Sequence, residues 1–225
     1  MTLAEVLQQL ESVGTEQNRN IYRRHGAGDV QFGVSFGNLN KMAKAIKRDH
    51  SLALELWETG NADARSLATL VADPTVMTVK DLDSWVKDIS YYLHADLVAR
   101  HVAAKSPHAR ALMLKWMKSR EDFCAQVGWD LLALQAMDGR VKDSEADAYL
   151  KTIETRIQRA KNRTRHAMNN ALIALGLRSP KFQKKAIAAA RRVGKVEVDH
   201  GETNCETPDA EKYIRRAAAR KRKRA

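Results

Sequence analysis

The chain has 225 residues, of which 39 are Lys or Arg and 27 are Asp or Glu, giving a formal net charge of +12. A hydrophobic content of 44% excludes a fully disordered protein, and the low counts of 11 Gly and 4 Pro disfavour a turn-rich all-β fold. The two cysteines are too few for a disulfide framework, and no apolar run approaches the length of a membrane span. Because the N-terminus also lacks a signal-peptide pattern, we expect a cytoplasmic, helical protein without membrane contact.

The first half of the chain alternates predicted helices with short polar breaks. Thr2 is the expected N-cap of the first helix, because Glu5 completes a capping box with it. Asn18–Gly33 is rich in Gly, Arg and polar residues and is predicted to be a loop. Apolar residues at helical spacing then predict helices in five ranges. These are Asn38–Arg48, Leu52–Glu58, Ala64–Ala72, Thr78–Asp88 and Tyr91–Ala104.

The second half continues the helical pattern. Four helices are predicted, and Ser179-Pro180 then begins a last long helix that runs through Arg192. The four are His108–Ser119, Asp122–Met137, Ser144–Arg159 and Arg163–Leu177. Helix pairs recur roughly every 30–40 residues, which is typical of helical-repeat solenoids. The sequence therefore predicts an all-α fold, an α-α superhelix over residues 1–195.

The C-terminal part departs from this pattern. Lys195–Gly201 is expected to be extended and to end in a turn, and Thr207-Pro208-Asp209-Ala210 is expected to begin a short helix. Residues 196–214 are thus predicted to form a structured loop and short helix that close the last repeat. Residues 215–225 are predicted to be a flexible polybasic tail, which supplies +7 of the net charge.

Two groups of basic residues are candidate contacts to a polyanion. Arg156, Arg159 and Arg163 recur at i, i+3 and i+7, which predicts one basic helix face with Arg165 nearby. Such a face is either a phosphate clamp, since guanidinium groups pair with phosphate oxygens, or a solvated surface with Glu154 as a local partner. The second group lies in the tail and consists of Arg220, Lys221, Arg222, Lys223 and Arg224.

Other candidate sites have less support. Arg23, Arg24 and His25 form a weaker basic cluster. His200 and Cys205 lie five residues apart, but a zinc site needs further N or S ligands that their surroundings lack. No nucleotide-binding or zinc-protease motif is present, so we expect neither a cofactor nor a metal.

Several segments resemble the DNA alkylation repair family, which includes the AlkD-type DNA glycosylases. The resemblance is carried by Phe32–Leu39, by Ala53–Arg65 and by Leu82-Asp83-Ser84-Trp85, and it covers most of residues 20–195. It implies a solenoid of HEAT-like helix pairs whose concave face holds duplex DNA, in a bacterial cytosol or nucleoid. It further implies excision of cationic alkylpurines such as 7-methylguanine and 3-methyladenine.

The resemblance also implies positions for site residues. Asp88 is similar to the family's catalytic carboxylate, which stabilises positive charge on the sugar, and Trp85 to a Trp that contacts the lesion or sugar. Val127 stands where active relatives have an Arg, and Asn170 where they have a second Trp. With a shift of one helical turn, Trp129 becomes a substitute.

Three functions remain open from the sequence. The first is a DNA-binding member of the family that excises cationic alkylpurines with Asp88 as the catalytic carboxylate. The second is a non-catalytic binder of distorted or branched DNA, favoured by the missing Arg and Trp. The third is a protein-interaction scaffold, because helical-repeat surfaces often hold peptides. No obligate protein partner is implied.

Overall fold

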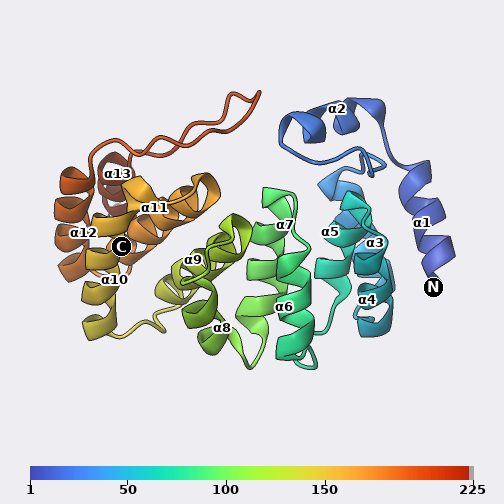
Figure 1. Ribbon diagram of the computed structural model, residues 1–225, viewed down its shortest axis with the longest axis horizontal. Helices are drawn as coiled ribbons and strands as arrows, with labels where there is room; N and C mark the ends of the chain where they lie inside the picture. Colours follow the sequence, from blue (N-terminus) through green and yellow to red (C-terminus); the bar gives the residue numbers. More distant parts are fainter. Residues whose placement is uncertain (223–225) are drawn as a thin grey trace. The chain divides into compact units, whose positions relative to one another are not determined.

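Residues 1–222 are described by the computed structural model, and within that range every regular element is a helix (Figure 1). The chain divides into two units: unit 1 comprises Met1–Ala109 and His200–Asn204, and unit 2 comprises Arg110–Asp199 and the chain from Cys205 onward. The predicted all-α class is confirmed. No helix in the described range is long and apolar enough to cross a membrane.

Unit 1 contains seven α-helices and two short irregular helical segments. Thr2 caps the first helix in the expected capping box with Glu5. The predicted range Tyr91–Ala104 is not one uniform α-helix, because a π-helical segment and a 3-10 turn complete it. The elements are α1 (Leu3–Ser12), α2 (Glu16–Arg24), α3 (Phe36–Ile46), α4 (His50–Glu58), α5 (Ala62–Val71), α6 (Val79–Lys87), α7 (Tyr92–Leu97), η1 (Val98–Val102) and η2 (Ala103–Lys105).

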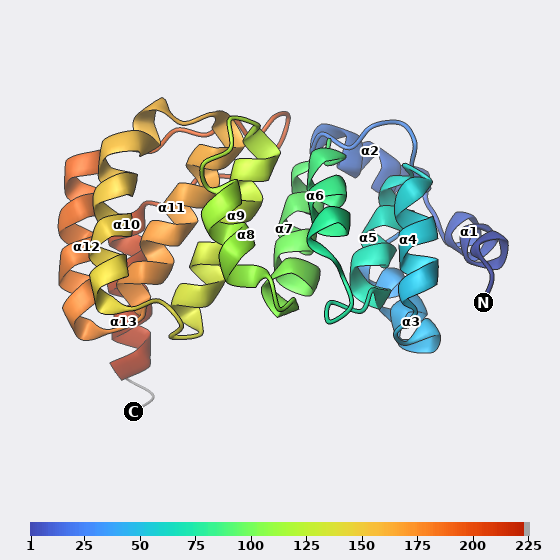
Figure 2. The same ribbon diagram turned by 60° about the horizontal axis from the view of Figure 1, so that its bottom comes forward.

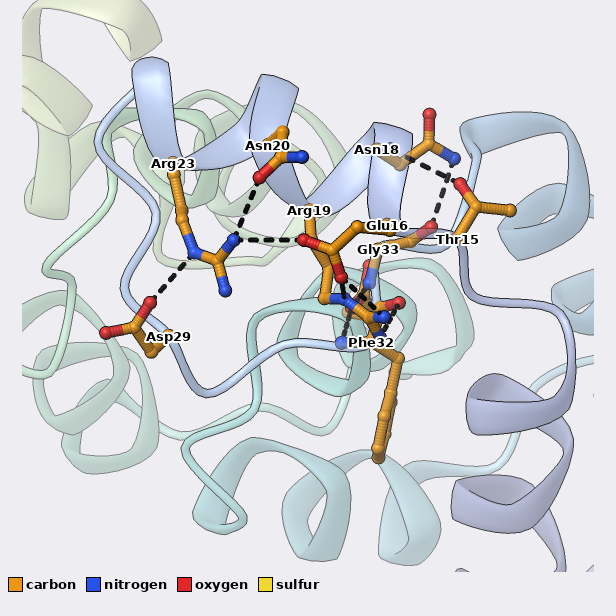
Figure 3. A network of polar contacts seen from close by, with 10 residues as sticks. Thr15, Glu16, Asn18, Arg19, Asn20, Arg23, Asp29, Phe32 and Gly33 are labelled. Atoms are coloured by element: carbon orange, nitrogen blue, oxygen red, sulfur yellow. Dashed lines mark hydrogen bonds and ion pairs between the residues drawn. The ribbon is translucent and has the colours of Figure 1, made fainter.

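The predicted loop over Asn18–Gly33 is wrong in its first part, because α2 occupies Glu16–Arg24 (Figure 3). Thr15 caps this helix, and Glu16 forms ion pairs with Arg19 and Arg23 (Figure 3). α2 has no fully buried residue, so it lacks the apolar stripe by which a helix is recognised in sequence. Its cap and charge pairs stabilise it instead.

The core of unit 1 centres on two stacked tryptophans. The rings of Trp57 on α4 and Trp85 on α6 lie 4.3 Å apart between centroids and are nearly parallel, at 5°. Both side chains are buried, and the guanidinium of Arg65 lies 5.0 Å from the Trp57 ring centroid. Arg65 also donates to the carbonyls of Trp57 and Asp88, so it joins the ends of α4 and α6 to α5.

A buried carboxylate fixes the loop that follows α2. Asp63, in the first turn of α5, accepts hydrogen bonds from the backbone N–H groups of Phe32, Gly33 and Val34 at 2.6, 2.9 and 2.9 Å. We call this arrangement the Asp63 clamp. It explains the motif around Asp63 structurally, because three backbone donors, two of them buried, need an acceptor at this place.

Unit 2 is built around α11, which packs against α9, α12 and α13 (Figures 1 and 2). Gly176 permits the close approach, since a Cβ there would meet the Ile214 side chain at 2.7 Å and the Ala186 Cβ at 2.9 Å. The elements are α8 (Ala109–Trp116), α9 (Asp122–Met137), α10 (Asp143–Arg156), η3 (Ile157–Arg159), α11 (Asn162–Leu177), α12 (Pro180–Val193) and α13 (Ala210–Arg222). The last helix therefore extends well into the basic segment.

Candidate nucleic-acid interface

A pocket of about 280 Å³ opens on unit 2. It lies where the chain after α8, the middle of α9, the C-terminal end of α10 with η3, and the first turns of α11 come together. Its lining combines apolar side chains, two hydroxyls and two arginines, and we call it the unit 2 pocket. The lining residues are Met117, Trp129, Thr155, Arg156, Arg159, Ala160, Thr164 and Met168.

A glycine in α9 allows the apolar wall to form. A Cβ on Gly128 would lie 2.3 Å from the backbone nitrogen of Met117, so only glycine lets α9 pack this closely on the end of α8. Met117 and Trp129, the residues on the two sides of this contact, both line the pocket. Trp129 is only 3% exposed, so a small part of its ring reaches the pocket surface.

A second clamp holds the start of α11 at the pocket. The carboxylate of Asp122 accepts from the backbone N–H groups of Arg163 and Thr164 at 3.0 and 2.7 Å. It also accepts from the Thr164 hydroxyl at 2.7 Å. We call this the Asp122 clamp. It satisfies donors of the first turn of α11 and fixes Thr164 in the pocket wall.

The cationic side of the pocket is unneutralised. Arg156 and Arg159 are exposed, and neither forms an ion pair with any of residues 1–222. The amide of Gln158, between them, donates to the carbonyls of Val193 and Lys195, which anchors η3. No carboxylate lines the pocket. The site thus presents two free guanidinium groups, one at the end of α10 and one on the anchored turn η3.

Three cations of α12 and one at the end of α11 are neutralised by acidic residues of α10. The hydrogen bond from Arg192 lowers the pKa of Glu154. Glu154 is therefore engaged by α12, although the sequence suggested it as a partner for the arginines. The α10–α12 region pairs are Arg178 and Lys181 with Asp143, Lys185 with Asp147, and Arg192 with Glu154.

The predicted single basic face of Arg156, Arg159 and Arg163 is wrong. Ala160 is extended, which separates η3 from α11, so the three arginines belong to α10, η3 and α11 respectively. Arg163 is buried, at 9% exposed, and Arg165 donates to the carbonyls of Glu197 and Ala160. Only Arg156 and Arg159 of the predicted group line the pocket.

Trp85, for which the resemblance implies a lesion or sugar contact, is a buried packing residue in this structure. Its ring is 2% exposed and stacks on Trp57, which leaves no free face for a base or sugar. Asp88 is the exposed C-cap of α6, and its carbonyl accepts from Arg65. Trp85 is therefore a buried packing residue, and Asp88 is a solvated carboxylate.

The C-terminal basic residues lie on or beyond α13. Arg220 is exposed on this helix, and the backbone of Lys221 and Arg222 continues it. Lys223 and Arg224 lie outside the described residues. Arg23, which belongs to the weaker basic cluster, pairs with Glu16 and Asp29.

Sequence reasoning missed several parts of the pocket. Met117, Thr164 and Met168 come from segments separated in the chain and carry no motif. The one local signal was Gly128 beside Trp129 in the middle of a predicted helix, where a glycine costs stability unless two backbones approach closely.

Comparison with known proteins identifies the family. The family described as DNA alkylation repair enzyme matches residues 6–220. The chain belongs to the DNA alkylation repair family. Two uncharacterized proteins are similar to this chain, one from Listeria innocua at 30% identity and one from Listeria monocytogenes at 28% identity. Each alignment covers 98% of this chain and 99% of the relative.

A solved structure confirms the HEAT-like repeat fold of this DNA alkylation repair family member. It represents a family of proteins related to the HEAT-like repeat DNA glycosylases with affinity for branched DNA structures. The similarity has a TM-score of 0.90 at 31% identity and covers 99% of this chain and 96% of that chain. The predicted HEAT-like class and family are thus both confirmed.

Proposed function

We propose that this protein binds duplex DNA with a preference for branched structures and that the unit 2 pocket is part of the contact surface. The observation that carries the proposal is the pair Arg156, at the end of α10, and Arg159, on the anchored turn η3, both exposed and without an acidic partner in the described range. Guanidinium groups in this state favour phosphate oxygens, which they bind in a bidentate manner. The affinity of the similar structure's family for branched DNA supports the same conclusion.

The net charge of +12 supports a backbone contact rather than base readout. Each phosphate neutralised by Lys or Arg releases counterions, so affinity should fall steeply as salt rises. Arg220 on α13 is a further candidate contact, as are Lys221, Arg222, Lys223 and Arg224 on the basis of their charge.

Excision of alkylpurines is the second candidate function. Its support is Asp88, whose side chain is exposed at the end of α6, and the family's name. Against it stand the buried Trp85 and the apolar, fully buried Val127 at the position where the resemblance expects an Arg. Asn170, which is part-buried on α11, replaces the expected second Trp. We therefore place DNA binding first.

The test of DNA binding compares an end-labelled four-way junction with a linear duplex of the same sequence and length. Fluorescence anisotropy is measured at several salt concentrations. We expect tighter binding to the junction and a negative slope of log affinity against log salt for both DNAs. Equal affinities would contradict the branched-DNA preference, and no binding at low salt would contradict the proposed function.

The test of excision is single-turnover release of 7-methylguanine and 3-methyladenine from alkylated duplex DNA. Asp88→Asn removes the carboxylate charge while keeping its shape, and Glu58→Gln, at another exposed carboxylate of unit 1, is the control. Our proposal predicts no release by the parent protein. Release that only Asp88→Asn abolishes would make Asp88 catalytic and reverse the order of the two functions.

A further inference from the structure

We propose that the unit 2 pocket holds one unpaired nucleotide of a branched DNA strand, and this inference rests on the proposed DNA binding. The base would lie against Met117, Trp129 and Met168, and the adjoining phosphates against Arg156 and Arg159. A pocket for a single nucleotide would distinguish a branch point with an exposed base from a fully paired duplex, whose bases are stacked inside the helix.

The pocket's size and wall fit a single ring system. A volume of about 280 Å³ is at the lower limit of pockets that hold small organic ligands, about 300–1,000 Å³. Methionine side chains adapt to planar rings and make favourable contacts between sulfur and aromatic edges. Because Trp129 and Met168 are only 3% and 2% exposed, the half-buried Met117 provides most of the accessible apolar contact. The wall therefore suits a base without specifying which one.

The charge of the lining selects an anionic ligand. Two guanidinium groups lie beside the apolar wall and no carboxylate faces them within it. A neutral base that carries its phosphate is attracted to this arrangement, whereas a cationic alkylated base is repelled by the same two charges. The Asp122 carboxylate behind Thr164 is already engaged by two backbone N–H groups and a hydroxyl, and no carboxylate belongs to the lining itself, so a developing sugar cation has no free carboxylate in the lining to stabilise it. The site is thus built for capture of a nucleotide rather than for base excision.

The walls are held in place before a ligand arrives. The Asp122 clamp fixes Thr164, Gln158 anchors η3 between the two arginines, and the close contact at Gly128 sets Met117 beside α9. A fixed pocket costs little ordering of side chains on binding, which favours capture of a base that is already unpaired.

The experiment uses two three-way junctions that differ in one feature. One has a single unpaired 2-aminopurine nucleotide at the branch point, and the other is fully paired with 2-aminopurine at the same place. Anisotropy of an end label gives affinity, and 2-aminopurine emission reports the environment of the base. We expect about tenfold tighter binding to the first junction, with a change in emission that the second lacks.

Three variants test the assignment. Arg156→Gln with Arg159→Gln should remove most of the tenfold preference, because the phosphate contacts are lost. Ala160→Leu adds bulk to the pocket wall without changing charge, and should also remove the preference. Arg216→Gln, an exposed residue of α13, is the control, which should keep the ratio between the two junctions. Circular dichroism confirms that each variant is folded.

The outcomes separate this inference from the proposed function. Equal binding to the two junctions, with branched DNA still preferred over linear duplex, would overturn the pocket assignment alone. Failure to bind any junction would overturn the proposed function as well. We expect that a free deoxynucleoside monophosphate does not displace the junction from the protein. Tight binding of the free nucleotide, without a preference for the unpaired junction, would assign the pocket to free nucleotides and contradict our proposal.

Discussion

Asp63 in unit 1 and Asp122 in unit 2 both lie in the first turn of a helix and both accept hydrogen bonds from the backbone of a distant segment. The surroundings differ. The Asp63 clamp is buried and holds a loop against α5, next to a closed aromatic core. The Asp122 clamp fixes Thr164 in the wall of an open pocket. The same interaction thus stabilises one unit and shapes a binding surface in the other.

The tryptophans show the same contrast. All three tryptophans are buried, but Trp57 and Trp85 stack on each other, whereas Trp129 lines the unit 2 pocket together with two free arginines. The family resemblance directed attention to unit 1, where its best-conforming residues serve packing. The cationic site lies in unit 2, in segments without a motif. The motif residues of unit 1 therefore stabilise the fold, whereas the candidate binding site of unit 2 is recognised from the charge and shape of its pocket.

The largest expected effect is loss of the Asp63 clamp. Asp63→Ala should lower the free energy of unfolding of unit 1 by about 3–5 kcal/mol, because three N–H groups, two of them buried, lose a charged acceptor. Amide hydrogen exchange at Phe32, Gly33 and Val34 measures the loss directly. Asp29→Ala, at an exposed ion pair with Arg23, is the control and should leave this exchange unchanged. Unchanged exchange in Asp63→Ala would show that the clamp is not needed.

The closed core of unit 1 also predicts a dependence on pH. Burial lowers the pKa of His94 to about 4, with a smaller contribution from Arg65 in the same direction. Nε2 of His94 lies 2.9 Å from the Ala62 carbonyl and so carries the proton, and buried Nδ1 has no partner in the described range.

Because the unfolded chain takes up a proton near pH 6.5 and the folded one only near pH 4, stability is full above pH 6.5 and falls between these values. The loss should reach about 3 kcal/mol near pH 4. Urea unfolding of the parent and of His94→Gln, from pH 7.5 to 4, gives the free energy of unfolding of each protein as a function of pH. If this free energy falls equally steeply in both proteins, His94 is not the group responsible.

The next effect tests how closely α8 and α9 pack. Gly128→Ala places a Cβ at 2.3 Å from a backbone nitrogen, so one of the two segments has to move. We expect a loss of about 1–3 kcal/mol in the free energy of unfolding, together with weaker capture of the unpaired nucleotide. Gly28→Ala, where nothing lies within 4 Å of the new Cβ, is the control. Equal stability of the two variants would contradict the account of the pocket wall.

The smallest effect concerns the Asp122 clamp, which is only half-buried. A double-mutant cycle with Asp122→Ala and Thr164→Val should give a coupling energy of about 1–2 kcal/mol, since the hydroxyl–carboxylate bond is charge-assisted. If the two single substitutions change the free energy of unfolding additively, Asp122 acts through the backbone of α11 alone.

The sequence was sufficient for most helices, because apolar residues at helical spacing and caps such as Thr2, Thr78 and Ser179 define them locally. It failed for α2, whose stability comes from a cap and charge pairs instead of an apolar face. The candidate site could not be predicted, because spacing placed Arg163 with Arg156 and Arg159 while the extended Ala160 separates them. Burial of Trp85 likewise depends on Trp57, which belongs to another helix.

The most direct test of the account is a comparison of two variants on one DNA. Dissociation constants for a four-way junction are measured for Arg156→Gln with Arg159→Gln, and for Asp88→Asn. We predict about tenfold weaker binding by the arginine variant, with a smaller salt slope, and unchanged or tighter binding by Asp88→Asn, which loses a negative charge. Junction binding that survives loss of both arginines but collapses in Asp88→Asn would contradict the central claim that DNA is held at the unit 2 pocket.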